Sequence, residues 1–262
     1  MTAPITALDG RVLRCRIAAG KAGTLDGEAM TAVAETLRGL ATAEQAAEQG
    51  VGAILLAHDG GSFCTGGDVR AFEGAEDRGA YVKQLADTFH EFLEAYVHCA
   101  VPSVAGVQGW AAGAGMSVVL ATDIVVAGRS TKLRPAYPGI GFSPDGGMSW
   151  TLPRIVGHGR ARQILLTDQV LEADALLDTG IVASVVEDAE LAAEAERTAH
   201  RLAQGPTAAL GRIKRLLADS WSADLRTQLD AEAAAISASA SGAEGAEGLA
   251  SFVGKRVPRF HQ

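Results

Sequence analysis

The chain has 262 residues, with a net charge of −8 and 48% apolar residues, a composition typical of a globular protein with one large core. The acidic balance argues against nucleic acid as the main partner. The three cysteines, Cys15, Cys64 and Cys99, form no C-x-x-C pair, so neither a disulfide framework nor a zinc site is expected. The first residues lack a basic segment followed by an apolar run, so the expected location is the cytoplasm. Glycines, Pro102 and polar residues interrupt the uncharged stretch from Ala100 to Thr122, so no membrane span is expected.

The first hundred residues are expected to alternate short strands with amphipathic helices. Asp9-Gly10 is a two-residue turn signal between alternating segments, which predicts a hairpin. Apolar residues at helical spacing predict the helices. The expected elements are a hairpin at Thr6–Ala18, helices at Leu25–Leu40 and Tyr81–His98, a strand at Val51–Ala57, and loops at His58–Arg70 and Phe72–Gly79.

The next segment reads as a strand, a glycine-rich turn and a buried helix. The strand Val104–Val107 is followed by Gly109, Gly113 and Gly115, and the helix continues to Ala121 without a charge. The free N–H groups at the start of that helix favour negative charge. If the charge develops on a substrate oxygen, the turn is an oxyanion hole.

The remainder of the chain is predicted to be mixed up to Val186 and almost wholly helical from Glu190 onward. The expected elements are strands at Ile124–Ala127, Thr131–Arg134 and Ile181–Val186, helices at Ser149–Val156, Gly159–Leu166 and Ala173–Asp178, a loop at Pro135–Met148, and helices from Glu190 onward. Mixed strands and helices followed by helices alone predict an α/β core with a helical C-terminal part.

Two glycine-rich segments are Ser62–Arg70, SFCTGGDVR, and Gly109–Ser117, GWAAGAGMS. Together they resemble the crotonase superfamily, also called the enoyl-CoA hydratase/isomerase family. Ile140–Gly157 and the ending Phe252–Phe260 also match, so the resemblance covers nearly the whole chain. It implies a ββα spiral core in residues 1–195. It also implies a helical C-terminal region in residues 196–262 that assembles trimers or dimers of trimers.

The resemblance also implies a site for an acyl-CoA thioester. In the family the thioester carbonyl is held by two backbone N–H groups, which correspond here to Gly67 and Ala114. The family usually has glycine at the second place, and Ala114 keeps the N–H. The positions implied to bind coenzyme A are Ala22, Gly66, Asp68, Val69, Arg70, Phe252 and Lys255. Coenzyme A is expected as part of the substrate, with no tightly bound cofactor and no metal, and Asp68 is equally expected to be a helix cap.

The residues at the catalytic positions favour isomerisation. Hydratases of the family use two glutamates, but this chain has Ser117 and Tyr137 there. Neither hydroxyl is an effective base near neutral pH. Asp145 matches the aspartate of several isomerases of the family, such as the ring-epoxide isomerase of phenylacetate breakdown. One carboxylate can take a proton from one carbon and return it to another, although an aspartate in a Pro-Asp-Gly turn often only bonds backbone N–H groups.

Three alternatives stay open. A hydratase could use a non-standard base, and a binding protein could keep the pocket without turnover, because both glutamates are absent. In aromatic dehalogenases of the superfamily, an aspartate at the place of Asp145 is the nucleophile and a histidine on the preceding helix is the base. His90 lies on such a helix, although Tyr137 stands where those enzymes carry tryptophan. Cys64 is expected to be a core residue.

Overall fold

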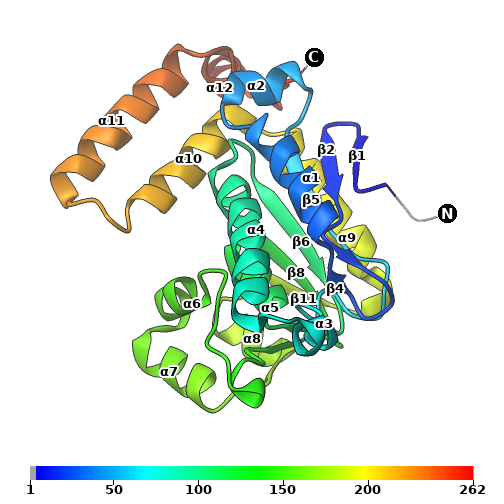
Figure 1. Cartoon of the computed structure of the whole chain (residues 1–262). Helices are drawn as coiled ribbons and strands as arrows, with labels where there is room; N and C mark the ends of the chain where they lie inside the picture. Colours follow the sequence, from blue (N-terminus) through cyan, green and yellow to red (C-terminus); the bar gives the residue numbers. More distant parts are fainter. Residues whose placement is uncertain (1–3, 262) are drawn as a thin grey trace.

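The computed structural model describes residues 4–261, and its centre is a six-stranded sheet (Figure 1). The strand order is β1-β2-β5-β6-β8-β11. β1 and β2 form the predicted antiparallel hairpin, and the other neighbours pair in parallel. The strands are β1 (Thr6–Asp9), β2 (Val12–Cys15), β5 (Ala53–Leu56), β6 (Ser103–Val107), β8 (Ile124–Gly128) and β11 (Ser184–Val186).

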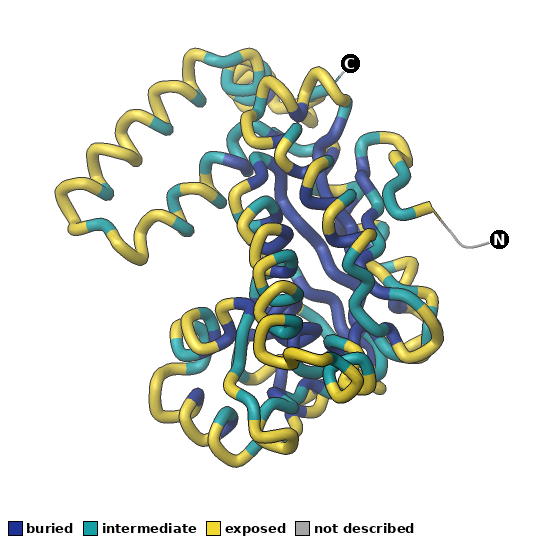
Figure 2. Tube along the Cα trace, in the orientation of Figure 1, coloured by how far each residue is buried: buried dark blue, intermediate teal, exposed yellow. Residues whose placement is uncertain are grey.

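Helices cover both faces of this sheet. α1 (Gly27–Arg38) and α4 (Arg78–His98) pack on one face, and α9 (Leu191–Ala203) packs on the other. Side chains of a strand point to alternate faces, so in β5 Ile54 and Leu56 join the α1 and α4 core while Leu55 contacts the α9 side. Figure 2 shows the strands as the buried centre of the molecule. Continuous apolar strands are expected for a parallel sheet covered on both faces.

A smaller sheet carries the glycine-rich turn. Its strand order is β10-β9-β7, formed by β10 (Leu171–Glu172), β9 (Lys132–Arg134) and β7 (Trp110–Ala112). α5 (Ala114–Ala121) begins directly after β7. A two-stranded pair, β3 (Ala18–Ala19) with β4 (Thr24–Leu25), lies near the N-terminus. The three-residue strand β7 is absent from the prediction, which treated the segment as a turn.

A short helix also replaces part of the loops that the sequence predicted after Cys64. α3 (Val69–Gly74) begins at Asp68, whose Oδ1 accepts hydrogen bonds from the N–H groups of Arg70 and Ala71 at 3.0 and 3.4 Å. This contact is a helix N-cap. The loop predicted at Phe72–Gly79 was therefore wrong over its first three residues, where the cap at Asp68 has already started a helix. It was also wrong over its last two residues, where α4 (Arg78–His98) has begun.

From Met148 onward the described chain is mostly helical, and beyond Glu190 it is helical as predicted. The helices here, besides α9, are α6 (Met148–Val156), α7 (His158–Leu166), α8 (Ala173–Asp178), α10 (Thr207–Asp219), α11 (Leu225–Ser241) and α12 (Ala243–Val253). Earlier in the chain, α2 spans Ala43–Glu48. α10 and α11 form a hairpin that extends away from the body (Figure 1). The proposed boundary between residues 195 and 196 falls inside α9, whose Ala199 and Ala203 pack on the sheet. Among residues 4–261, no helix offers an apolar stretch sufficient to span a bilayer.

Candidate active site

Backbone hydrogen bonds hold the two glycine-rich segments side by side. The Cys64 N–H donates to the carbonyl of Trp110 at 3.1 Å, and the Ala112 N–H donates to the carbonyl of Cys64 at 2.9 Å. Gly115, in the first turn of α5, packs so closely on the Cys64 carbonyl that a side chain would overlap it. Glycine at this position therefore lets the first loop lie directly against the start of the helix.

The N–H groups of Gly67 and Ala114 come together at this junction. Gly66 turns the chain with φ +85°, and a Cβ built on it would lie 3.5 Å from the Ala114 nitrogen. Within residues 4–261, neither the Gly67 nor the Ala114 N–H has a hydrogen-bond acceptor. Two free donors at one place, one of them at a helix N-terminus, can stabilise a developing oxyanion.

Asp145 lies on a turn that three contacts attach to the surrounding elements. Its carboxylate Oδ1 accepts a hydrogen bond from the Tyr137 hydroxyl at 2.5 Å. Its carbonyl accepts from the Ser117 hydroxyl of α5 at 3.0 Å, and the next N–H, of Gly146, donates to His90 Nε2 of α4 at 3.1 Å. Ser117 is three residues after Ala114, so Asp145 is tied to the helix that begins with the free Ala114 N–H.

Gly146 explains how the turn can approach both helices. Its φ is +60°, and a Cβ there would overlap the Phe89 ring and come within 2.8 Å of Ser117 Cβ. A residue with a side chain would have to move the turn away from α4 and α5. The position of Asp145 thus depends on the small residue that follows it.

The electrostatics of the site leave one carboxylate oxygen of Asp145 available. Burial, then the charge of Asp145 and the hydrogen bond to it, raise the pKa of Tyr137, so its hydroxyl stays protonated and donates. In the described part of the chain, Oδ2 of Asp145 has no hydrogen-bond donor. Burial raises the pKa of the Cys64 thiol to about 12, so Cys64 is not an activated nucleophile.

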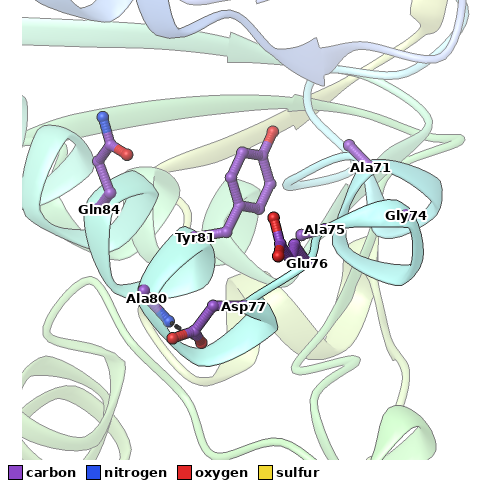
Figure 3. Close-up of a pocket in the computed structure, with 8 residues that line it drawn as sticks. All are labelled: Ala71, Gly74, Ala75, Glu76, Asp77, Ala80, Tyr81 and Gln84. Atoms are coloured by element: carbon purple, nitrogen blue, oxygen red, sulfur yellow. Dashed lines mark hydrogen bonds between the residues drawn. The ribbon is translucent and has the colours of Figure 1, made fainter.

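Aromatic side chains cover the oxyanion turn. The Phe72 ring of α3 lies over Gly67, where a Cβ would come within 2.6 Å of it. Phe72 stacks on Phe142 at 6.3 Å between ring centroids and meets Tyr81 edge-on at 6.2 Å. A hollow of about 430 Å³ lies beside this cluster between α3 and α4 (Figure 3). It is lined by Ala71, Gly74, Ala75, Glu76, Asp77, Ala80, Tyr81 and Gln84.

The structure gathers most, but not all, of the positions expected to contact coenzyme A. Val69 and Arg70 are exposed at the start of α3, directly after the Gly66 turn. Ala22 is exposed on the loop whose next residue, Gly23, packs against the backbone of Ser62 and Phe63. In contrast, the end of α12, which carries Phe252 and is followed by Lys255, lies far from α3 (Figure 1). Phe252 is 85% exposed, so one chain alone does not bring these two residues to the site.

The contacts of Tyr137 and His90 with the Asp145 turn were not predicted. The sequence marks Tyr137 as the residue at the second glutamate position and His90 as a possible dehalogenase base, and neither as a partner of the Asp145 turn. No periodic pattern links them to Asp145, because the contacts depend on the turn at Gly146 and on β9. The one usable signal is that Tyr137 and Asp145 lie in the same short loop, Pro135–Met148, which also holds three prolines and four glycines. In residues 4–261, no group of three or more His, Cys, Asp or Glu side chains is arranged to hold a metal.

Comparison with known proteins identifies the family of the chain. The family model described as enoyl-CoA hydratase/isomerase matches residues 25–262. The 1,2-epoxyphenylacetyl-CoA isomerase of Escherichia coli strain K12 is 34% identical over 212 residues, 79% of this chain and 80% of the relative. The 4-chlorobenzoyl coenzyme A dehalogenase-1 of an Arthrobacter species is 31% identical over 225 residues, 85% of this chain and 81% of the relative.

A solved structure matches along almost the full length. The crystal structure of an enoyl-CoA hydratase from Polaromonas sp. JS666 superposes with a TM-score of 0.88 at 28% identity, covering 97% of this chain and 98% of that one. The fold is therefore the crotonase fold, α/β with a helical C-terminus. The chain belongs to the enoyl-CoA hydratase/isomerase family.

Proposed function

We propose that the protein is an acyl-CoA isomerase in which Asp145 is the single acid and base. The observation that carries this proposal is the arrangement of the Asp145 carboxylate. Tyr137 holds Oδ1, while Oδ2 has no donor among the described residues. The turn is anchored to the helix that starts with the Ala114 N–H. A fixed carboxylate beside a pair of N–H donors is suited to proton transfer next to a thioester.

The reaction follows from these groups. The thioester oxygen would accept hydrogen bonds from the N–H groups of Gly67 and Ala114. Oδ2 of Asp145 takes a proton from one carbon of the acyl chain, and the C–H electron pair moves toward the thioester oxygen to give an enolate or dienolate. The N–H donors stabilise that charge as it develops. Asp145 then returns its proton to another carbon, so the double bond moves and no atom is gained.

The hydratase alternative is weakened by what occupies the two glutamate positions. The Ser117 hydroxyl donates to the Asp145 carbonyl, and the Tyr137 hydroxyl donates to the Asp145 carboxylate. Both side chains support Asp145, and neither brings a second carboxylate that could activate water. A hydratase would therefore have to use Asp145 alone.

A dehalogenase-type reaction is a second candidate, because His90 lies beside the Asp145 turn. In that reaction Asp145 would attack an aromatic carbon and His90 would activate water. The Nε2 lone pair of His90, however, accepts the Gly146 N–H, so Nδ1 carries the proton of the neutral ring. Neither ring nitrogen is then a free base, which favours isomerisation.

We also propose which acyl group the pocket accepts and which residues of a neighbouring copy complete the coenzyme A site. The cluster of Phe72, Tyr81 and Phe142 favours an acyl group with a ring, such as the epoxyphenylacetyl group in the name of the Escherichia coli relative. Coenzyme A would contact Ala22, Gly66, Asp68, Val69 and Arg70 of one chain. It would also contact Phe252 and Lys255 of a neighbouring copy, in a trimer or a dimer of trimers.

Product analysis tests the proposed reaction. We would incubate the protein with linear enoyl-CoAs, epoxyphenylacetyl-CoA and 4-chlorobenzoyl-CoA, and measure product mass and released chloride. An isomer with the mass of its substrate, formed by the wild type and not by Asp145→Asn, is the expected result. A product heavier by one water would indicate a hydratase. Chloride release would indicate the dehalogenase reaction, and binding without turnover on every substrate would indicate a binding protein.

A further inference from the structure

One segment, residues 134–137, joins the oxyanion turn to the catalytic carboxylate. At its start, the Arg134 carbonyl accepts a hydrogen bond from the Gly113 N–H at 3.0 Å, directly before Ala114. At its end, Tyr137 donates to Asp145. The Tyr137 ring also lies 4.0 Å from the Cβ position of Gly113. The course of these four residues therefore sets where the Tyr137 hydroxyl lies relative to the Ala114 N–H.

Asp168 holds this segment from outside the site. Its Oδ2 accepts from Nε and Nη2 of Arg134 at 2.9 and 2.5 Å, and its Oδ1 accepts from the Ala136 N–H at 2.7 Å. The Asp168 side chain is only 12% exposed. A carboxylate engaged through both oxygens, including two guanidinium donors, is a strong and directional contact.

The backbone at this contact lies in an unfavourable conformation. Ala136 has φ +64° and Asp168 has φ +52°, a region that residues with a side chain rarely adopt. Such conformations persist where the surroundings hold them. The Asp168 carboxylate bonds the Ala136 N–H itself, so the residue before Tyr137 is fixed in this conformation by Asp168.

We infer that Asp168 is a positioning residue that, through Arg134 and Ala136, places the Tyr137 hydroxyl on Asp145. Asp168 acts through the 134–137 segment and does not touch the reacting atoms. Without it, Ala136 can relax to negative φ and the Tyr137 ring turns away from the carboxylate. The kinetic part of this inference rests on the proposed function, and its structural part does not.

The structural part is tested by NMR of ring-labelled tyrosine. The chain has three tyrosines, so the signal of Tyr137 is assigned by Tyr137→Phe. Its shift without the Asp145 acceptor is measured in Asp145→Ala, which removes both side-chain oxygens. Asp168→Gly removes the carboxylate while tolerating positive φ, and Asp168→Asn keeps an acceptor for Ala136 but not the charge for Arg134. The matched control is Asp174→Ala, which removes an exposed ion pair with Arg129 nearby.

In Asp168→Gly we expect the Tyr137 signal to move toward its position in Asp145→Ala, and in Asp168→Asn to move part of that way. The control should leave the signal in place. A Tyr137 signal unchanged in the folded Asp168 variants would overturn the inference. This readout needs no substrate, so its outcome is separate from that of the proposed isomerase activity.

The kinetic part is tested with an active substrate. We expect Asp168→Gly to lower kcat about tenfold or more, as for a displaced catalytic group, with little change in KM. In the Tyr137→Phe background the same substitution should lower kcat no further, since contacts that act through one group are not additive. Equal losses in both backgrounds would show that Asp168 acts through the general stability of the fold and would overturn the inference.

Discussion

Ala114 supplies its N–H from the first position of α5, where no carbonyl within the helix can accept it. Proline is well suited to this first position, because its φ is helical and it lacks the N–H that the helix does not use. The residue therefore offers a way to delete one oxyanion donor and keep the helix.

The expected result for Ala114→Pro is a fall in kcat of about 10²–10³, the usual cost of one oxyanion donor. The melting temperature should stay close to that of the wild type. Ala114→Gly, which keeps the N–H, is the matched control and should retain activity. The donor role is wrong if the proline variant turns over as fast as the glycine variant.

The raised pKa of Tyr137 makes the stability of the folded protein depend on pH in the alkaline range. Burial and the Asp145 charge raise its pKa in the folded protein, while an unfolded tyrosine titrates near pH 10. The unfolded state therefore releases this proton first, so stability is lost as pH rises above about 10, by about 1.4 kcal/mol per pH unit for one tyrosine. Urea unfolding at about pH 9 and pH 11 should show a larger loss in the wild type than in Tyr137→Phe. Equal losses would contradict the raised pKa.

At the scale of elements, α10 is joined to the core by one buried lysine. Lys214 Nζ lies 3.0 Å from the Asp123 carboxylate with its side chain 9% exposed. It also donates to the carbonyls of Tyr96 and Val101 at 3.1 and 3.3 Å. Removing one member of a buried pair leaves the other charge unpaired in a poorly solvated place.

We expect Lys214→Met to lower the free energy of unfolding by about 3–5 kcal/mol. The control is Lys83→Met, because Lys83 pairs with Asp87 on the surface with its side chain 75% exposed. That pair is expected to contribute less than about 1 kcal/mol. Urea denaturation of both variants measures the difference, and similar losses would contradict a structural role for the buried pair.

The sequence predicted well those elements that show a clear hydrophobic pattern, either helical spacing of apolar residues or a continuous apolar run. α1 and α4 have apolar side chains at helical spacing, and β5 and β6 are continuous apolar runs. The six-residue α3 and the three-residue β7 were missed, because neither is long enough to show a recognisable hydrophobic pattern. The pairing of Tyr137 with Asp145 could not be predicted either. It requires the left-handed turn at Gly146 and a contact made by the distant residue Asp168.

At the scale of the whole molecule, the hairpin of α10 and α11 leaves large apolar side chains in solvent. Among them, Leu225 is 74% exposed and Ile236 is 71% exposed. Apolar side chains repeated along one projecting hairpin are typical of a surface that another protein chain covers. A second copy of the chain is the proposed partner, and it would also supply Phe252 and Lys255.

Light scattering of the wild type is expected to give the mass of three or six chains. Ile236→Glu places a charge on the exposed side of α11 and should yield smaller species, with weaker coenzyme A binding measured by calorimetry. Leu8→Glu changes a side chain that is 51% exposed on β1, so it should leave the assembly intact. A monomeric wild type at micromolar concentration would contradict the proposed assembly.

In the proposed reaction, Asp145 moves a proton next to a thioester held by the N–H groups of Gly67 and Ala114. The most direct measurement is hydrogen exchange of a bound acyl-CoA in heavy water, followed by mass spectrometry for the wild type and Asp145→Asn. We expect deuterium uptake at the acyl carbons by the wild type and none above background by the variant. Uptake at the same rate in both proteins would contradict the claim and assign the proton transfer to another group.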